Sequence, residues 1–116
     1  MIIRKNKTLG GPGLLESVYE EALVWELQQI KLQVERQKLV PIKYKSQQLA
    51  APLRLDVLVE NLVIIECKAV REYNSIFEIQ TLTYLRLTNL RLGLVINFGE
   101  RFLKNGVHRV TNGLKQ

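Results

Sequence analysis

The amino-acid sequence predicts an α/β protein in which a mixed β-sheet is flanked by helices. Two segments, residues 14–30 and 76–87, carry apolar residues at the 3.6-residue period of a helix. The other apolar runs are short and rich in Val, Ile and Leu, as strands are. In chain order the expected elements are helix, strand, strand, strand, helix, strand and a short terminal hairpin, and this α-β-β-β-α-β order favours a mixed sheet.

Length and composition are those of one folded domain. Within the 116 residues we expect residues 1–13 to form a basic, glycine-rich lead-in and residues 14–116 to form a single domain. One cysteine excludes an intramolecular disulfide, and no apolar run reaches the roughly 18 residues of a membrane span. We therefore expect a cytoplasmic protein. Its formal charge of +6 is compatible with a polyanionic partner.

The first helix has an apolar arc too wide for a surface helix, so we expect it to be substantially buried. The arc includes Tyr19 and Trp25, which we assign to the core rather than to stacking on nucleic acid. Glu16 lies in the first turn, at the margin of this arc. Its carboxylate either faces inward or is a first-turn acid favoured by the helix dipole.

Turn and cap residues place the elements on either side of the centre. Residues 33–44 alternate loosely and predict a strand with Pro41 at a bulge or an edge, followed by a turn over residues 45–48. Ser75 and Glu78 form a capping-box pattern at the start of the second helix.

The C-terminal part of the chain predicts a buried strand and a hairpin. Residues 92–98 are short, continuous and apolar, as a fully buried strand is. The Asn105-Gly106 pair is a strong turn motif, which we expect to fold residues 102–104 onto residues 107–110. His108, the only histidine, would then lie on the surface of the terminal strand.

A central stretch, residues 53–68, places three charged side chains inside two apolar strands. Asp56 lies in the first strand, and Glu66 and Lys68 lie in the second, after a polar break. Ionisable groups inside buried strands are costly unless they are paired or bind a metal. These three residues therefore need a compensating partner.

The pairing register decides whether these charges meet. Glu66 and Lys68 share one strand face, and Cys67 points oppositely, as a small core residue. Asp56 joins them only if residue 56 opposes residue 66, through a three-residue turn at 60–62 or a bulge. A two-residue turn would oppose it to Ile65. We expect the first register, which brings the two carboxylates within about 5 Å at their β carbons, where both can bind one hard cation.

Converging Asp, Glu and Lys side chains suit phosphodiester hydrolysis. Asp56 and Glu66 would hold Mg²⁺ or Mn²⁺, which neutralises phosphate charge and acidifies a bound water, while Lys68 orients or deprotonates the attacking water. Gln80 and Tyr84 lie at i and i+4 on the second helix, where they could hydrogen-bond phosphate or a metal-bound water.

Each charged residue also has a simpler interpretation. Asp56 could form a strand-edge salt bridge with Arg54 or Lys68, and Glu66 could form a cross-strand ion pair with Lys68. The presence of all these residues in one order, with the polar pair on the second helix, favours the nuclease-type site.

Four motifs in this order resemble the PD-(D/E)XK nuclease superfamily and, more narrowly, the GxxExxY family of small bacterial proteins. The resemblance covers about residues 9–114. Its motifs are Gly13-Leu-Leu-Glu16-Ser-Val-Tyr19, Asp56 within residues 54–60, Glu66-Cys67-Lys68, and Gln80-Thr-Leu-Thr-Tyr84.

The resemblance implies a restriction-endonuclease-like core that cleaves DNA or RNA with Mg²⁺ or Mn²⁺. Asp56, Glu66 and the carbonyl of Cys67 would be metal ligands, and Glu16 a further acidic ligand or water-holder from the first helix. The resemblance also implies that Lys68 is the catalytic lysine and that Gln80 and Tyr84 are groups that support the site.

One departure from the family pattern leaves alternatives open. Family members carry a Val-His pair on a helix before the glycine-rich turn, where this sequence has Arg4-Lys5-Asn6-Lys7. The alternative function is therefore a catalytically inactive nuclease-fold module that binds nucleic acid or a protein partner. A homodimer with a structural role is a third interpretation.

Overall fold

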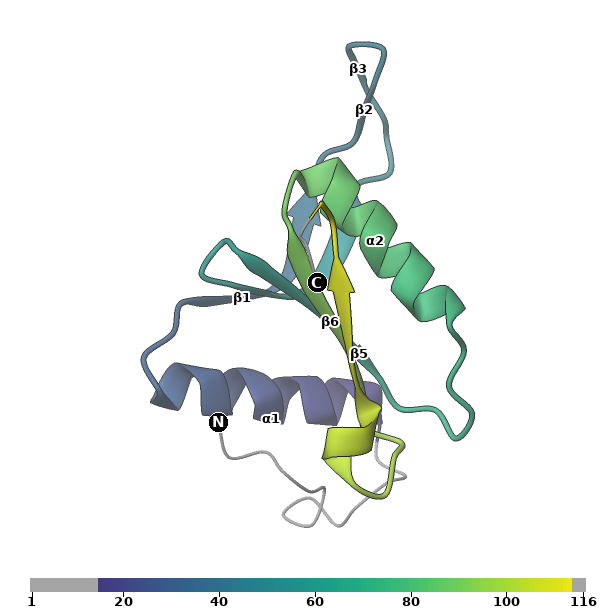
Figure 1. Cartoon of the computed structure of the whole chain (residues 1–116). Helices are drawn as coiled ribbons and strands as arrows, with labels where there is room; N and C mark the ends of the chain where they lie inside the picture. Colours follow the sequence, from purple (N-terminus) through teal and green to yellow (C-terminus); the bar gives the residue numbers. More distant parts are fainter. Residues whose placement is uncertain (1–14, 114–116) are drawn as a thin grey trace.

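The computed structural model describes residues 15–113 and confirms the α/β class, with a five-stranded mixed sheet flanked by helices (Figure 1). The predicted lead-in of residues 1–13 and the expected helix start at Leu14 lie outside the described residues. The elements in chain order are α1 (Glu16–Gln29), β1 (Val34–Val40), β2 (Lys43–Tyr44), β3 (Gln47–Gln48), β4 (Leu53–Val59), β5 (Val63–Lys68), α2 (Ile76–Thr88), β6 (Leu92–Asn97), the 3₁₀ helix η1 (Leu103–Gly106) and β7 (Val107–Thr111).

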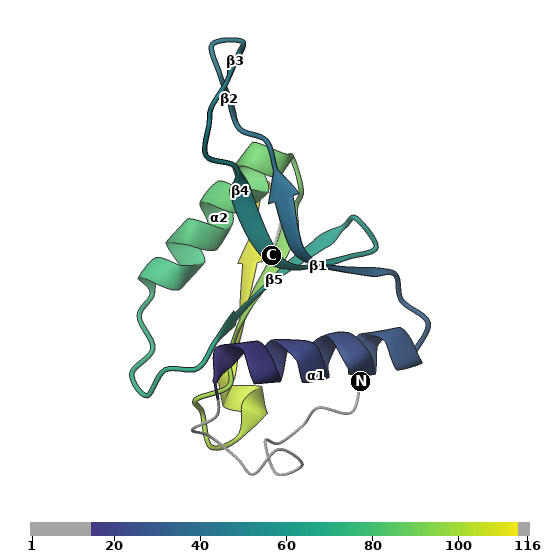
Figure 2. The same cartoon turned by 180° about the vertical axis from the view of Figure 1, so that it is seen from behind.

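The main sheet has the strand order β1-β4-β5-β6-β7. Only β5 and β6 run parallel, and α2 is the crossover that such a pair requires. The other neighbours are antiparallel, and β1 and β7 are the edges. β2 and β3 form a separate two-stranded arm that projects beyond the sheet (Figure 2).

The two helices pack on opposite faces of this sheet and create two apolar cores. On the α1 face, Tyr19 stacks on Phe98 with ring centroids 4.9 Å apart. On the α2 face, Leu85 packs with Ile64, whereas the neighbouring Ile65 belongs to the α1 core. Alternate residues of β5 therefore serve different cores, as the two-residue period of a strand requires.

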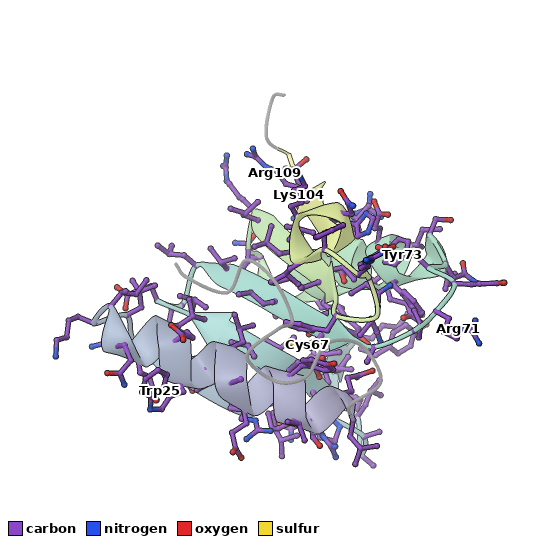
Figure 3. The ribbon with its side chains drawn as sticks, turned by 90° about the horizontal axis from the view of Figure 1, so that it is seen from below. Trp25, Cys67, Arg71, Tyr73, Lys104 and Arg109 are labelled. Carbon is purple, nitrogen blue, oxygen red and sulfur yellow. The ribbon has the colours of Figure 1, made fainter. Side chains whose placement is uncertain are left out.

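The helix α1 is less buried than its apolar arc predicts. Tyr19 is in the core as expected, but the Trp25 side chain is 57% exposed and the prediction that it is buried is wrong. Figure 3 shows Trp25 on the side of α1 away from the sheet. The sheet covers one side of α1, so the outer half of a wide arc stays exposed.

The start of α2 differs from the predicted capping box. The side chain of Ser75 makes no capping hydrogen bond. The neighbouring Asn74 accepts the Ile76 amide with its side-chain oxygen at 2.9 Å. The second helix thus begins where the sequence predicts, with a different capping residue.

The predicted terminal hairpin is wrong, because β7 pairs with β6 rather than with residues 102–104. A tight hairpin turn at Asn105-Gly106 requires positive φ, and neither residue adopts it. Both belong to η1 instead. Gly106 allows a close approach of two backbone segments, since a Cβ there would lie 2.2 Å from the carbonyl oxygen of Asn97.

The edge strand β1 ends at Val40, directly before Pro41, in agreement with the predicted edge position. The chain then enters the arm, whose turn consists of Lys45 and Ser46, both with positive φ. The turn is shorter than the predicted residues 45–48, because residues 47 and 48 pair back onto β2.

Candidate functional site

The strands β4 and β5 pair in the predicted register. Val59 opposes Val63 and Val57 opposes Ile65, around a three-residue turn at 60–62, so the next position places Asp56 opposite Glu66. At that position side chains replace the regular ladder. The Asp56 amide donates to Oε2 of Glu66 at 3.0 Å, and the Cys67 amide donates to Oδ2 of Asp56 at 2.9 Å.

On its other side, Asp56 lies at a break in the ladder between β4 and β1. Pairing holds at Arg36–Val57 and Lys38–Leu55 and skips the intervening position, where Gln37 has a left-handed φ of 54°. Leu55 packs in the α2 core and Val57 in the α1 core, although residues two apart normally share a face. The sheet therefore switches faces at Asp56, and the predicted simple sharing of one face by Asp56 and Glu66 is replaced by this break.

A second acid from α1, Glu20, reaches the same region. It is only 4% exposed and accepts hydrogen bonds from Nε of Arg36 at 2.5 Å and from the amide of Gln37 at 2.9 and 3.0 Å. Sequence reasoning missed this residue. Its helical spacing gives a usable indication, because Glu20 falls on the same α1 face as the buried Leu23 and Leu27.

The Cys67 side chain is fully buried in the α1 core, as predicted, yet it does not point away from every acid. Its sulfur and carboxylate oxygens of Glu20 and Asp56 all lie within 4.8 Å of one another. Burial, followed by the nearby negative charges, raises the pKa of the Cys67 thiol well above its ordinary value, so the thiol is neutral at physiological pH.

Three carboxyls at the break, those of Glu16, Asp56 and Glu66, have raised pKa values. Burial raises the pKa of Glu66 to about 8, repulsion from Asp56 adds to the rise, and the Asp56 amide and Lys68 oppose it. Burial is also the largest cause of the raised pKa values of Asp56 and Glu16, and the Glu20 charge contributes to both. The mutual effects place Glu16, Glu20, Asp56 and Glu66 in one acidic cluster.

Lys68 lies beside this cluster without pairing directly to it. Its charge lowers the pKa values of Glu16, Asp56 and Glu66. Within residues 15–113 its ammonium forms no ion pair within 4 Å and instead lies 4.8 Å from the centre of the Phe77 ring. The simpler interpretation of Lys68 as an ion-pair partner of Asp56 or Glu66 is therefore wrong, and Arg54 likewise makes no ion pair in this part of the chain.

The end of β5, which carries Lys68, is held in place by β6. The Phe98 amide donates to the carbonyl of Lys68 at 2.7 Å. The fully buried Asn97 accepts the amides of Val70 and Gly99 and donates its own side-chain N–H to the carbonyl of Val70, at 2.9 to 3.0 Å. These bonds fix the backbone just after Lys68.

The two predicted residues of α2 differ in their surroundings. Burial raises the pKa of the half-buried Tyr84, and the charges of Glu66 and Asp56 raise it further, so Tyr84 lies near the acidic pair. Gln80 is exposed and, among the described residues, its side chain makes no hydrogen bond. Only Tyr84 is connected to the cluster electrostatically.

His108 is not simply a surface residue, and that prediction is wrong. Because β7 lies beside β6, the ring of His108 stacks on Tyr73 with centroids 3.8 Å apart and planes at 10°. Its Nδ1 lies 3.8 Å from Oε2 of Glu78, which also accepts the Tyr73 hydroxyl at 3.1 Å. Tyr73 in turn contacts Phe77 edge-on, so this aromatic group borders Lys68.

The acidic cluster has the chemistry of a divalent-cation site. Four carboxyls face two cations, Lys68 and Arg36, which leaves two excess negative charges when all six groups are ionised. Carboxylate oxygens are hard donors that suit Mg²⁺-like ions. The residues therefore fit a divalent cation.

The order of these residues matches a known family. The sequence profile of the PD-(D/E)XK nuclease superfamily matches residues 2–110. The chain belongs to the PD-(D/E)XK nuclease superfamily. Nucleases of the PD-(D/E)XK superfamily generally use divalent metals, in agreement with the acidic cluster.

A solved structure has a fold similar to that of this chain. The crystal structure of SSO0001 is similar to this chain with a TM-score of 0.61 and 18% sequence identity, over 86% of this chain. The chain spans 52% of the length of that protein, so the likeness concerns the fold alone. No curated protein matches the chain. Among the described residues, no helix is long and apolar enough to cross a membrane.

Proposed function

We propose that the protein is a nuclease that hydrolyses DNA or RNA phosphodiesters with the help of Mg²⁺ or Mn²⁺. The observation that carries this proposal is the opposition of Asp56 and Glu66 at the sheet break, where each carboxylate accepts a backbone N–H of the other strand. A buried acid, Glu66, and a half-buried acid, Asp56, repel each other at this opposition unless a cation or a proton lies between them. A divalent cation relieves that repulsion.

The proposed ligands are Asp56, Glu66 and the carbonyl of Cys67, with Glu16 as a further acidic ligand or water-holder. Glu16 is supported by its electrostatic coupling to Asp56 and Lys68. The structure adds Glu20, whose oxygen lies within the 4.8 Å group that includes Asp56. When bound, the cation supplies positive charge to the phosphate and acidity to the attacking water.

Lys68 is proposed to orient or deprotonate that water and to offset the negative charge that develops on phosphate. Support comes from its position beside the carboxylates with an ammonium that is not held in an ion pair within the described residues. Tyr84, near the acids, and Gln80, one turn away on α2, are proposed to hydrogen-bond the phosphate or the cation's water.

Narrower assignments follow the resemblance of the motifs. We propose that the chain belongs to the GxxExxY branch of the superfamily, on the strength of Gly13, Glu16 and Tyr19 and their spacing. A cytoplasmic location and a homodimer are further predictions of this proposal.

The alternative is a catalytically inactive nuclease-fold module that binds nucleic acid or a protein partner. One observation favours it. Glu20 is already neutralised by Arg36, with an N–O distance of 2.5 Å, and a neutralised carboxylate attracts a cation less.

Cleavage assays distinguish the two functions. Single- and double-stranded DNA and RNA are incubated with the wild type and with Mg²⁺, Mn²⁺ or EDTA. We expect cleavage that needs the cation and falls at least about 100-fold in Lys68→Ala and Glu66→Ala. Lys38→Ala and Glu35→Ala are matched controls, because these residues form an exposed pair at 2.7 Å, and both should cleave at the wild-type rate.

The other outcomes of the cleavage assay distinguish a contaminant from an inactive protein. Cleavage that survives both Lys68→Ala and Glu66→Ala would come from a contaminant and would contradict the proposal. Absence of cleavage of every substrate, together with retained nucleic-acid binding, would support the inactive module.

A further inference from the structure

The arm formed by β2 and β3, residues 42–49, has no role in the acidic cluster and stands out by its charge. The surrounding segment, residues 36–55, contains five basic residues and no acid. Arg36 and Lys38 are engaged by glutamates. The remaining three basic residues are Lys43, Lys45 and Arg54, and they form no ion pair in the described part of the chain.

The arm projects from the body of the protein, which it contacts through Ile42 at its base. Figures 1 and 2 show it projecting past the ends of the sheet and of α2. Its own contacts are the pairs Lys43–Gln48 and Tyr44–Gln47 and a hydrogen bond from the Leu49 amide to the Ile42 carbonyl at 2.7 Å. A hollow of about 390 Å³ lies at its base, lined in part by Ile42, Leu53 and Leu87.

The tip presents side chains that suit nucleic acid. Tyr44 is 60% exposed, and Nζ of Lys45 lies 5.4 Å from the centre of its ring. Gln47 and Gln48 are exposed on the returning strand. Lysines bind phosphates, and glutamine can hydrogen-bond a base edge.

We propose that this arm is a DNA-binding element that enters the major groove of a duplex next to the cleavage site. The inference rests on the proposed nuclease function and names double-stranded DNA as its substrate. The B-form major groove admits a two-stranded β-ribbon, whereas the A-form major groove of RNA is too deep and narrow for side chains to read.

The reach of the arm agrees with one duplex touching both places. Ten residues separate Asp56 from Ser46 at the tip, which is at most about 33 Å at about 3.3 Å per residue. Base pairs rise about 3.4 Å each, so the tip lies within about ten base pairs of Asp56. A duplex is stiff over that length, so we expect one straight duplex to contact both places.

The test compares two lysines in the same backbone conformation. Lys45 has φ 48° and Lys31, at the end of α1, has φ 68°, and both are exposed. Asparagine tolerates this conformation and removes the charge, so Lys45→Asn and Lys31→Asn form a matched pair. Binding to a fluorescent 20-base-pair DNA duplex is measured by anisotropy in EDTA, which prevents cleavage, over a range of salt concentrations.

We expect Lys45→Asn to weaken binding about 8-fold at 0.1 M salt and to reduce the salt slope by about 0.9, the value of one phosphate contact. Adding Lys43→Gln should bring the loss to about 60-fold. Lys45→Arg should restore binding, and Lys31→Asn should bind like the wild type. Binding to double-stranded RNA of the same length should change less than twofold in Lys45→Asn.

Equal DNA affinities for Lys45→Asn and Lys31→Asn, with both proteins folded by circular dichroism, would overturn the inference. An equal loss on RNA and DNA would overturn the major-groove assignment. These outcomes are separable from failure of the nuclease proposal, because binding in EDTA requires no cleavage. If the arm variants cleave duplex DNA at the wild-type rate, the nuclease proposal stands and the proposed DNA-binding role of the arm is wrong.

Discussion

Replacing Glu66 by Gln tests whether this buried carboxyl destabilises the cation-free protein at neutral pH. Folding raises the pKa of Glu66 from 4.5 to about 8. The folded protein therefore holds this proton more tightly than the unfolded chain does. The stability associated with the neutral carboxyl is fully present below about pH 4.5 and is lost as the pH rises through about 8.

The size of the effect follows from the same two values. A difference of 3.5 pH units, at about 1.4 kcal/mol each, corresponds to at most about 5 kcal/mol of unfolding free energy. This is a large part of the roughly 5–15 kcal/mol that stabilises a typical domain. Asp56 and Glu16 also have raised pKa values and act in the same direction, so the informative quantity is the difference between wild type and variant.

Urea unfolding in EDTA at pH values from 5 to 9 measures that difference. We expect the unfolding free energy of Glu66→Gln, relative to that of the wild type, to increase by several kcal/mol from pH 5 to pH 9. Adding Mn²⁺ at pH 8 should stabilise the wild type, by about 2.7 kcal/mol at 100 times its dissociation constant, and should stabilise the variant less. A difference that stays constant from pH 5 to 9 would refute the assignment of a buried, proton-binding Glu66.

Two further substitutions test the supports of the site. Arg36→Ala should destabilise the protein by about 2–3 kcal/mol in urea unfolding, because Glu20 is left buried without its cation, whereas Lys38→Ala, in an exposed pair, should cost less than about 1 kcal/mol. Equal losses of unfolding free energy in Arg36→Ala and Lys38→Ala would show that the buried pair with Glu20 contributes no more than an exposed pair. Asn97→Ala should cost about 3 kcal/mol, since two hydrogen bonds to the backbone of Val70 and one to the amide of Gly99 are lost. An unchanged melting temperature would contradict this structural role.

The strand register at the site could be predicted from the sequence because few alternatives fit it. A one-residue slip would send Glu66 to the other side of the sheet from Asp56, and both strands are apolar enough to fix their buried positions. The pairs of residues 57–59 with residues 63–65 have the predicted register, which brings residue 56 opposite residue 66 at the next position. The mixed sheet and the second helix followed from periodicity in the same way.

The residues that sequence reasoning missed depend on contacts between distant segments. Glu20 joins the cluster because Gln37 adopts a left-handed conformation on another strand and Arg36 lies beside it. No local pattern in α1 specifies that partner. His108 became part of an aromatic group because β7 pairs with β6, a choice that the Asn105-Gly106 motif did not reveal.

The solvent exposure of individual side chains could not be predicted from local sequence patterns either. The apolar arc of α1 is the same whether one or both sides are covered, and here the sheet covers one, which leaves Trp25 exposed. The break at Asp56 is similar, because a strand with regular alternation in sequence changes faces in the structure. Both outcomes are set by the packing of whole elements.

Metal-dependent cleavage at this site is tested by the rate of cleavage of duplex DNA as a function of Mn²⁺ concentration, for the wild type and for Lys68→Ala. We expect the wild-type rate to rise with Mn²⁺ concentration and to saturate. Lys68→Ala should be at least about 100-fold slower at saturation, while its half-saturating Mn²⁺ concentration changes less than about threefold, because the carboxylates that hold the cation are intact. A wild type that does not cleave with any Mn²⁺ concentration, or a Lys68→Ala variant that cleaves at the wild-type rate, would contradict metal-dependent cleavage at this site.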